Sequence, residues 1–156
     1  MAAATTTFDL AARLAVGRVF LGWSANGGPL LESFSRAGFD AVLIDNQHGV
    51  QGAAETRDGI GRIVGAGIPA LVRPELADWG GVSRGLDLGA AGIVMPMINT
   101  VADARELADA AKYPPLGKRS WGPARATTLH GLDAPAYFAR ANAATLAFAM
   151  IETREA

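Results

Sequence analysis

Four polar residues, Asp45 to His48, end an apolar run in the first third of the chain. The run 41–44 has strand character, and a glycine follows His48. Buried parallel strands deliver polar side chains to the rim of an α/β sheet in this way. Imidazole exchanges protons readily near neutral pH, and Asp45 is placed to orient the ring. The pattern indicates a proton-transfer site; the alternative is a histidine hydrogen-bonded at a strand end without a chemical task.

Two more charged residues end predicted strands. Arg73 closes a strand expected over 68–74, and Glu152 closes one expected over 146–152. A guanidinium has fixed donors suited to an enolate or carboxylate oxygen, and carboxylates suit hard cations such as Mg²⁺ and Mn²⁺. The alternatives are a surface salt bridge for Arg73 and a solvated side chain for Glu152. Because carboxyl ends of parallel strands meet at one edge, we expect both residues beside Asp45 and His48.

Strands and helices alternate along the chain. Strands are expected over 19–24, 41–45, 68–74, 90–97 and 146–152, and helices over 7–16, 29–37, 55–65, 82–88, 101–111 and 133–142. Thr100 with Asp103 resembles a capping box for the helix 101–111, and Asp133 is a candidate cap for the helix that follows it. Such alternation predicts a parallel sheet with crossover helices.

The segment between the last two predicted helices differs from the rest. Residues 113–117 contain two prolines and a glycine, which break the chain, and the stretch up to Leu132 is predicted to be an extended loop. His130 falls in this loop without a matching partner. We therefore expect it to be structural or solvated.

Doubly wound sheets and (β/α)₈ barrels both place their sites at strand carboxyl ends. No G-x-G-x-x-G motif stands in the first strand-to-helix turn, and its residues 26–29, Asn-Gly-Gly-Pro, form at best a weak phosphate cradle. The dinucleotide-binding interpretation is therefore disfavoured.

The amino-acid composition of the chain excludes several classes of function. The chain has 156 residues, enough for one domain, with 50% hydrophobic and 19% charged residues. A net charge of −1 argues against nucleic acid as a partner, and the absence of cysteine excludes disulfides and thiolate sites. The start lacks the pattern of a secretory signal, and no apolar run is long enough to span a membrane. We expect a cytoplasmic protein with no membrane partner.

Five motifs in order carry a family resemblance. They are Asp45-x-Gln-His48, Val72-Arg-Pro74, Pro96-Met97, Tyr113-Pro-Pro-x-Gly-x-Arg119 and Ile151-Glu-Thr-Arg154. With them the chain resembles the class II, metal-dependent pyruvate aldolases of the HpcH/HpaI type, which act on 4-hydroxy-2-oxoheptanedioate and 2-keto-3-deoxy sugar acids. The resemblance implies an α/β fold, a (β/α)₈ TIM barrel of roughly 250 residues.

The resemblance also sets an expectation for the extent of the chain. Residues 1–156 would form a single domain covering about the first five β/α units, the N-terminal part of a longer barrel. Five strands cannot close an eight-stranded barrel. The chain is then either a fragment, which we favour, or a shortened variant that completes itself by association.

The resemblance further implies an aldehyde-lyase. Its reaction would be reversible, divalent-metal-dependent cleavage of a 4-hydroxy-2-oxo acid to pyruvate or hydroxypyruvate and an aldehyde. It assigns catalysis to His48, Asp45 and Arg73, substrate binding to Trp23, Gln47, Arg73, Gly122 and Pro123, and a Mg²⁺, Mn²⁺ or Co²⁺ ligand to Glu152. Trp23 would be a pocket wall, and Gly122 and Pro123 would offer only backbone groups. The family's second metal carboxylate follows the next strand, beyond this chain.

Two positions depart from the family pattern. Gln47 stands where many relatives carry Glu, and Met150 stands where some carry Gln. The change at position 47 removes a negative charge near the metal, which bears on metal affinity and water placement.

The resemblance suggests a homo-oligomer, specifically a hexamer. Two other functions stay open: a related citrate or acyl-CoA-type barrel lyase, and a catalytically incomplete half-barrel that acts only in assembly.

Overall fold

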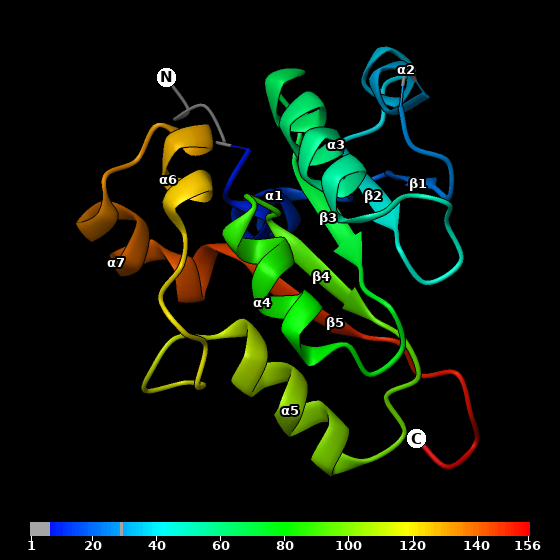
Figure 1. The fold of residues 1–156 in the computed structure, drawn as a ribbon, viewed down its shortest axis with the longest axis vertical. Helices are drawn as coiled ribbons and strands as arrows, with labels where there is room; N and C mark the ends of the chain where they lie inside the picture. Colours follow the sequence, from blue (N-terminus) through cyan, green and yellow to red (C-terminus); the bar gives the residue numbers. More distant parts are fainter. Residues whose placement is uncertain (1–6, 29) are drawn as a thin grey trace.

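The chain folds into a five-stranded parallel sheet in which each strand pairs with the next in sequence (Figure 1). The computed structural model describes residues 7–28 and 30–156. The strands are β1 (Leu21–Ser24), β2 (Ala41–Asp45), β3 (Ala70–Arg73), β4 (Gly92–Met95) and β5 (Leu146–Ala149). All neighbouring pairs are parallel, so all carboxyl ends lie at one edge of the sheet.

Helix α1 precedes the first strand, and the other helices connect successive strands. They are α1 (Leu10–Val16), α2 (Leu30–Arg36), α3 (Ala53–Gly65), α4 (Trp79–Asp87), α5 (Val101–Ala111), α6 (Ala124–His130) and α7 (Ala134–Ala144). The strand order never reverses, as it would in a doubly wound sheet, and sequential parallel strands are those of a (β/α)₈ barrel. The predicted α/β fold of barrel type is confirmed. The predicted helix start at Pro29 lies outside the described residues.

Alternation along the strands separates two buried faces. Val42 and Ile44 belong to an outer cluster that includes side chains of α2, α3, α4 and α5, whereas Ala41 and Leu43 belong to an inner cluster with Leu10 of α1. Successive strand residues point to opposite faces, so Asp45 continues the inner row of β2. Asp45 is in register with Arg73, and the two side chains therefore share the inner face at the carboxyl edge.

Side-chain caps define the first turns of helices α5 and α7. Thr100 Oγ1 accepts a hydrogen bond from the Asp103 N–H at 3.1 Å, and Asp103 Oδ2 accepts one from the Thr100 N–H at 2.9 Å. Asp133 likewise accepts a bond from the Ala136 N–H at 2.8 Å. The predicted capping box and the predicted cap of α7 are confirmed.

The expectation of an extended loop up to Leu132 was wrong, because α6 occupies part of it. This helix has no side-chain cap, and Ala126 is buried in a cluster with Phe8 and α7. Tertiary packing therefore stabilises a seven-residue helix that its own sequence does not signal.

His130 ends helix α6 and has a structural environment. Its Nε2 lies 2.9 Å from the carbonyl oxygen of Gly89, and its Nδ1 lies 3.2 Å from Thr7 Oγ1. A carbonyl only accepts, so Nε2 carries the proton. Burial lowers the pKa of His130, against the opposing effect of its bond to the Gly89 carbonyl. The neutral ring ties α6 to the turn before β4.

Within the described ranges, no helix is both long and apolar enough to cross a bilayer.

Candidate active site

Asp45 is the centre of the polar cluster at the carboxyl edge. Its Oδ1 accepts hydrogen bonds from the Gln47 N–H at 3.0 Å, the His48 N–H at 3.2 Å and Arg73 Nε at 2.8 Å. Its Oδ2 accepts bonds from Arg73 Nη2 and, at 3.2 Å, from Trp23 Nε1. Only 2% of Asp45 is exposed. The carboxylate is thus buried and surrounded by donors.

These donors keep Asp45 ionised. Burial alone would raise its pKa, but the bonds from Arg73, from the His48 N–H and from Trp23 outweigh burial and lower the pKa to about 2. Asp45 is therefore a fixed negative charge and is not poised to transfer a proton itself.

Arg73 uses only part of its guanidinium to hold Asp45. Nε and Nη2 bind the carboxylate in a two-point arrangement, while Nη1 has no hydrogen-bond partner among the described residues and is not among the buried unpaired atoms. The guanidinium carbon lies 4.9 Å from the centre of the Trp23 ring. Arg73 is therefore held on two sides and keeps a donor for a bound oxygen.

The loop after β2 is shaped around Asp45. Gln51, 8% exposed, donates from Nε2 to the carbonyl oxygens of Asp45 at 2.9 Å and Ser24 at 3.2 Å. A Cβ at Gly49 would overlap the Asp45 carbonyl and lie 2.8 Å from the carbonyl of Ala25. Only glycine allows this close approach. Sequence reasoning missed Gln51, because its partners are long-range backbone groups that leave no signal in spacing.

His48 is presented to the outside by this loop. His48 is exposed, and the hydrogen bond that it makes among the described residues is through its backbone N–H, not its imidazole. Asp45 accepts a hydrogen bond from the backbone N–H of His48 and so orients the loop that carries the ring. The expectation that Asp45 also orients the imidazole itself stays a prediction. Gln47 beside it is half-buried, and its Oε1 is buried without a partner.

Glu152 stands at the same edge, after β5, and is held by the loop after β4. Its Oε2 accepts a hydrogen bond from the Met97 N–H at 2.8 Å. Met97 has φ 55°, a left-handed conformation that is strained for a side chain of this size. Thr153 Oγ1 donates to Asn99 Oδ1 at 2.7 Å and joins the same two loops. The carboxylate is thus oriented by backbone, and none of its hydrogen bonds goes to Asp45 or Arg73.

The described residues supply only part of the ligand set that a divalent metal ion needs. Mg²⁺ and Mn²⁺ favour oxygen ligands, with one or two carboxylates supplemented by water and substrate. In residues 7–28 and 30–156, no group of three His, Cys, Asp or Glu side chains could hold an ion. Asp45 is already saturated by donors, which leaves Glu152 as one candidate ligand. The residues present therefore do not form a metal site by themselves.

Gly122 and Pro123 lie away from this cluster. A Cβ on Gly122 would lie 2.8 Å from Oδ2 of Asp87, the last residue of α4, and Pro123 precedes α6. A helix that follows a parallel strand returns to the amino edge, and Figure 1 shows the α5–α6 connection on the side away from the strand arrowheads. Within one chain the structure does not bring these two residues beside Asp45, because their loop packs behind α4. The expectation that they bind substrate stays a prediction.

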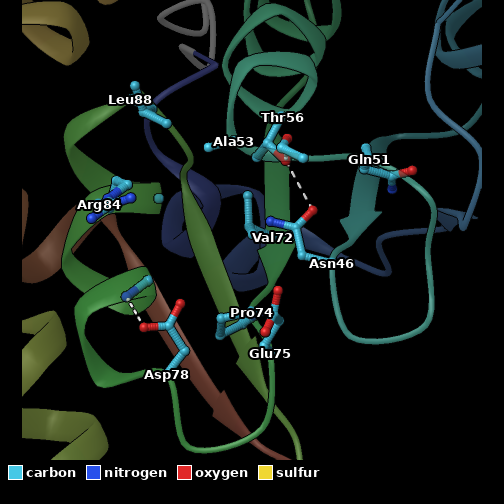
Figure 2. A pocket seen from close by; sticks show the side chains of 13 residues that line it. Asn46, Gln51, Ala53, Thr56, Val72, Pro74, Glu75, Asp78, Arg84 and Leu88 are labelled. Atoms are coloured by element: carbon cyan, nitrogen blue, oxygen red, sulfur yellow. Dashed lines mark hydrogen bonds between the residues drawn. The ribbon is translucent and has the colours of Figure 1, made fainter.

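A cavity of about 170 Å³ lies on the outer side of β2 and β3, between α3 and α4 (Figure 2). Asn46 faces it and accepts a hydrogen bond from Thr56 Oγ1 at 2.9 Å. Its lining contains neither Asp45, Arg73, His48 nor Glu152. This cavity is therefore separate from the polar cluster.

On the inner face, an apolar hollow of about 270 Å³ lies below Trp23. It is lined by Leu10, Leu14, Val19, Leu21, Trp23, Leu71, Val94 and Phe148. The polar cluster is therefore the rim of a largely apolar concave surface, the arrangement of a barrel mouth.

The model of one protein family, HpcH/HpaI aldolase/citrate lyase, matches residues 19–156. The chain belongs to this family. A hydroxypyruvate/pyruvate aldolase of Rhizorhabdus wittichii is 39% identical over 136 residues, 86% of this chain and 53% of the relative. A 4-hydroxy-2-oxovalerate aldolase of Novosphingobium aromaticivorans is 40% identical over 152 residues, 93% of this chain and 56% of the relative. The resemblance seen in the five motifs is confirmed.

Solved structures of an HpcH/HpaI aldolase and of a citrate synthase show the same fold. The aldolase from Desulfitobacterium hafniense superposes with a TM-score of 0.84 at 27% identity, covering 95% of this chain and 58% of that one. A citrate synthase, SbnG, superposes with a TM-score of 0.80 at 26% identity, covering 95% and 57%. The chain spans little more than half the length of the curated relatives it matches.

Proposed function

We propose that this chain carries the proton-transfer and oxyanion-binding half of a pyruvate aldolase site. The reaction is reversible cleavage of a 4-hydroxy-2-oxo acid to pyruvate, or hydroxypyruvate, and an aldehyde. The observation that supports this most strongly is the Arg73–Asp45 pair, which is buried at the carboxyl edge and in which Nη1 of Arg73 makes no hydrogen bond to any described residue. The aldolase names of the relatives agree with it.

His48, Arg73 and Asp45 each have a different role in the proposed reaction. As the C3–C4 bond breaks, His48 accepts the proton of the 4-hydroxyl group, and the electron pair of the bond forms the enolate of pyruvate. Arg73 donates from Nη1 to the C2 oxygen as it becomes negative. Asp45 keeps the guanidinium in place and balances its charge. A proton then returns to C3 to give pyruvate.

A divalent cation, Mg²⁺, Mn²⁺ or Co²⁺, would supply further stabilisation of the enolate oxygen. Glu152 is the residue that would bind it, with its carboxylate fixed by the Met97 N–H. At least one further carboxylate from outside the described residues would be needed, so the steps above rest on His48, Arg73 and Asp45 alone.

Substrate contacts follow from the same geometry. Trp23 forms a wall at the rim, and Gln47 offers a neutral amide beside His48 where many relatives carry a carboxylate. Together with the apolar hollow below, these groups suit a short 2-oxo acid whose charged end faces Arg73.

The direct test is pyruvate release by the full gene product from 4-hydroxy-2-oxo acids of different length. We expect cleavage by the unsubstituted protein, loss with a chelator, and loss in His48→Ala. Activity that survives both the chelator and His48→Ala would overturn the proposed mechanism. Ser83→Ala, a helix position away from the rim, is a control that should keep full activity.

The second candidate is a citrate- or acyl-CoA-type lyase. The SbnG likeness supports it, because that protein is a citrate synthase on the same fold. Calorimetric titration with coenzyme A separates the two functions. Micromolar binding would favour the second candidate, and no binding together with pyruvate release would favour the aldolase.

We further propose that residues 1–156 form one domain that is completed into an eight-stranded barrel, and that the protein forms a homo-oligomer, a hexamer by family resemblance. The open apolar inner face supports completion. Light scattering after size exclusion measures the oligomeric state; a monomer would contradict the second part of this proposal.

A further inference from the structure

Trp23 contacts both members of the Arg73–Asp45 pair. Its indole N–H donates to Asp45 Oδ2 at 3.2 Å, and its ring lies against the Arg73 guanidinium with 4.9 Å between the guanidinium carbon and the ring centre. The three residues come from three neighbouring strands, β1, β2 and β3. One side chain therefore touches the carboxylate with its edge and the guanidinium with its face.

The strand register explains why these contacts form. Trp23 is in register with Leu43, an inner-face residue two positions before Asp45, and Asp45 is in register with Arg73. The inner-face side chains of three strands thus converge at the carboxyl edge. Trp23 stays 44% exposed although it holds a buried pair.

We propose that Trp23 is a positioning residue: it fixes the plane of the Arg73 guanidinium, and with it the direction in which Nη1 points at the substrate oxygen. The proposal rests on the proposed function for its effect on rate. Two contacts make it specific. The hydrogen bond to Asp45 limits rotation of the carboxylate, and the ring face limits tilting of the guanidinium bound to it.

This role is additional to that of the pocket wall proposed above, and its effects on the kinetics are different. A wall acts on substrate directly, so its loss changes KM and does not depend on Arg73. A positioning residue acts through Arg73, so its loss lowers the rate of the step that Arg73 assists and has no further effect once Arg73 is altered.

The bond itself is tested by NMR of the indole N–H groups in the full gene product. The Trp23 signal is assigned by its disappearance in Trp23→Phe. We expect it to exchange slowly with solvent and to shift in Asp45→Asn, while the signals of Trp79 and Trp121 stay in place. Fast exchange and no shift in Asp45→Asn would overturn the contact on which the proposal depends.

The effect on chemistry is tested by a double-mutant cycle. The readout is exchange of the methyl protons of pyruvate with D₂O, which reports enolate formation without an aldehyde. Trp23→Phe keeps the ring face and loses the N–H, and we expect a rate about 10-fold lower with KM within about twofold. Trp23→Leu loses both contacts, and we expect a rate about 100-fold lower. Trp121→Phe, far from the rim, is the matched control and should not change the rate.

In an Arg73→Lys background, Trp23→Phe should add less than about a twofold effect. A full 10-fold effect in that background, or a change confined to KM, would show that Trp23 acts only as a wall in contact with the substrate and would overturn the proposal. If the unsubstituted protein exchanges no methyl protons, the proposed function fails, while the indole spectra still support or overturn the Trp23 contact by themselves.

Discussion

Within the described residues, two arginine–aspartate pairs with a buried arginine lie at opposite edges of the sheet. Arg73 pairs with Asp45 at the carboxyl edge, and Arg119 pairs with Asp87 at the end of α4, on the amino side. In both, the guanidinium lies over an aromatic ring, at 4.9 Å for Trp23 and 4.4 Å for Tyr113. The residue types alone do not distinguish them.

The pairs differ in which side chain is the more exposed and in whether the guanidinium keeps an accessible N–H donor. The Arg119 side chain is 0% exposed, and its Nε and Nη1 are buried without hydrogen-bond partners in the described part of the chain, whereas the Asp87 side chain is 25% exposed. At the carboxyl edge the aspartate is enclosed, and the arginine keeps an accessible nitrogen. The Arg119 guanidinium is enclosed by protein, so its pair with Asp87 is structural. The Arg73 guanidinium presents an unbonded N–H to a concave surface, so it can bind a substrate oxygen.

Substitution of the two histidines, one at each edge of the sheet, extends this comparison and gives the largest expected change in activity. His48→Ala removes an exposed ring without partners, so we expect about a thousandfold loss of pyruvate release with the free energy of unfolding unchanged within about 0.5 kcal/mol. His130→Ala removes a half-buried ring bonded to the Gly89 carbonyl, so we expect a loss of about 1–2 kcal/mol in stability and full activity per folded molecule. Urea unfolding and a pyruvate-release assay measure both. Reversal of the two outcomes would show that the chemistry lies at the other edge.

Substitution of Gly49 beside the Arg73–Asp45 pair and of Gly122 beside the Arg119–Asp87 pair gives the next largest expected effect, a loss of stability. In Gly49→Ala the new Cβ meets the backbone oxygen of Asp45, which cannot move without displacing β2, so we expect at least about 2 kcal/mol of destabilisation. In Gly122→Ala the Cβ meets the Asp87 carboxylate, which can rotate, so we expect a loss below about 1 kcal/mol. Urea unfolding of the two variants gives the comparison. Equal losses would mean that the loop around Asp45 is less constrained than its contacts indicate.

Acid sensitivity should trace to the carboxyl-edge pair. The pKa of Asp45 is lowered from 3.8 to about 2 in the folded protein, so the unfolded state binds a proton first as the pH falls. The stabilisation is complete above about pH 4 and disappears as the pH falls toward 2, a change of about 2 kcal/mol. Unfolding measured between pH 5 and 2 should show it. In Asp45→Asn this part of the slope should vanish, and in Asp87→Asn, where the Asp45 pair is intact, it should remain.

Much of the fold could be predicted because its signals are local or periodic. The strand Ala41–Asp45 and the helix Val101–Ala111 were placed at their observed bounds, since one is a continuous apolar run and the other has a side-chain cap. Helix α6 was missed because its seven residues include two threonines and no capping side chain, and packing of Ala126 decides its conformation.

The site could be predicted only in part. The placement of Asp45, Arg73 and Glu152 at one edge follows from strands ending in polar residues. The contacts do not, because the bond from Trp23 to Asp45 depends on strand register, and the bond from Met97 to Glu152 depends on a left-handed turn. The position of Gly122 away from Asp45 could not be predicted, because the path of a long connection is set by tertiary packing behind α4.

The most direct test of the central claim makes the same substitution at both pairs. Arg73→Lys and Arg119→Lys each keep the charge and remove the planar fork of donors. Pyruvate methyl-proton exchange, measured per folded molecule of the full gene product, should fall at least about 100-fold in Arg73→Lys and stay within about twofold of the unsubstituted protein in Arg119→Lys. An equal fall in both variants, or no fall in Arg73→Lys, would contradict the assignment of the carboxyl-edge pair as the oxyanion-binding site.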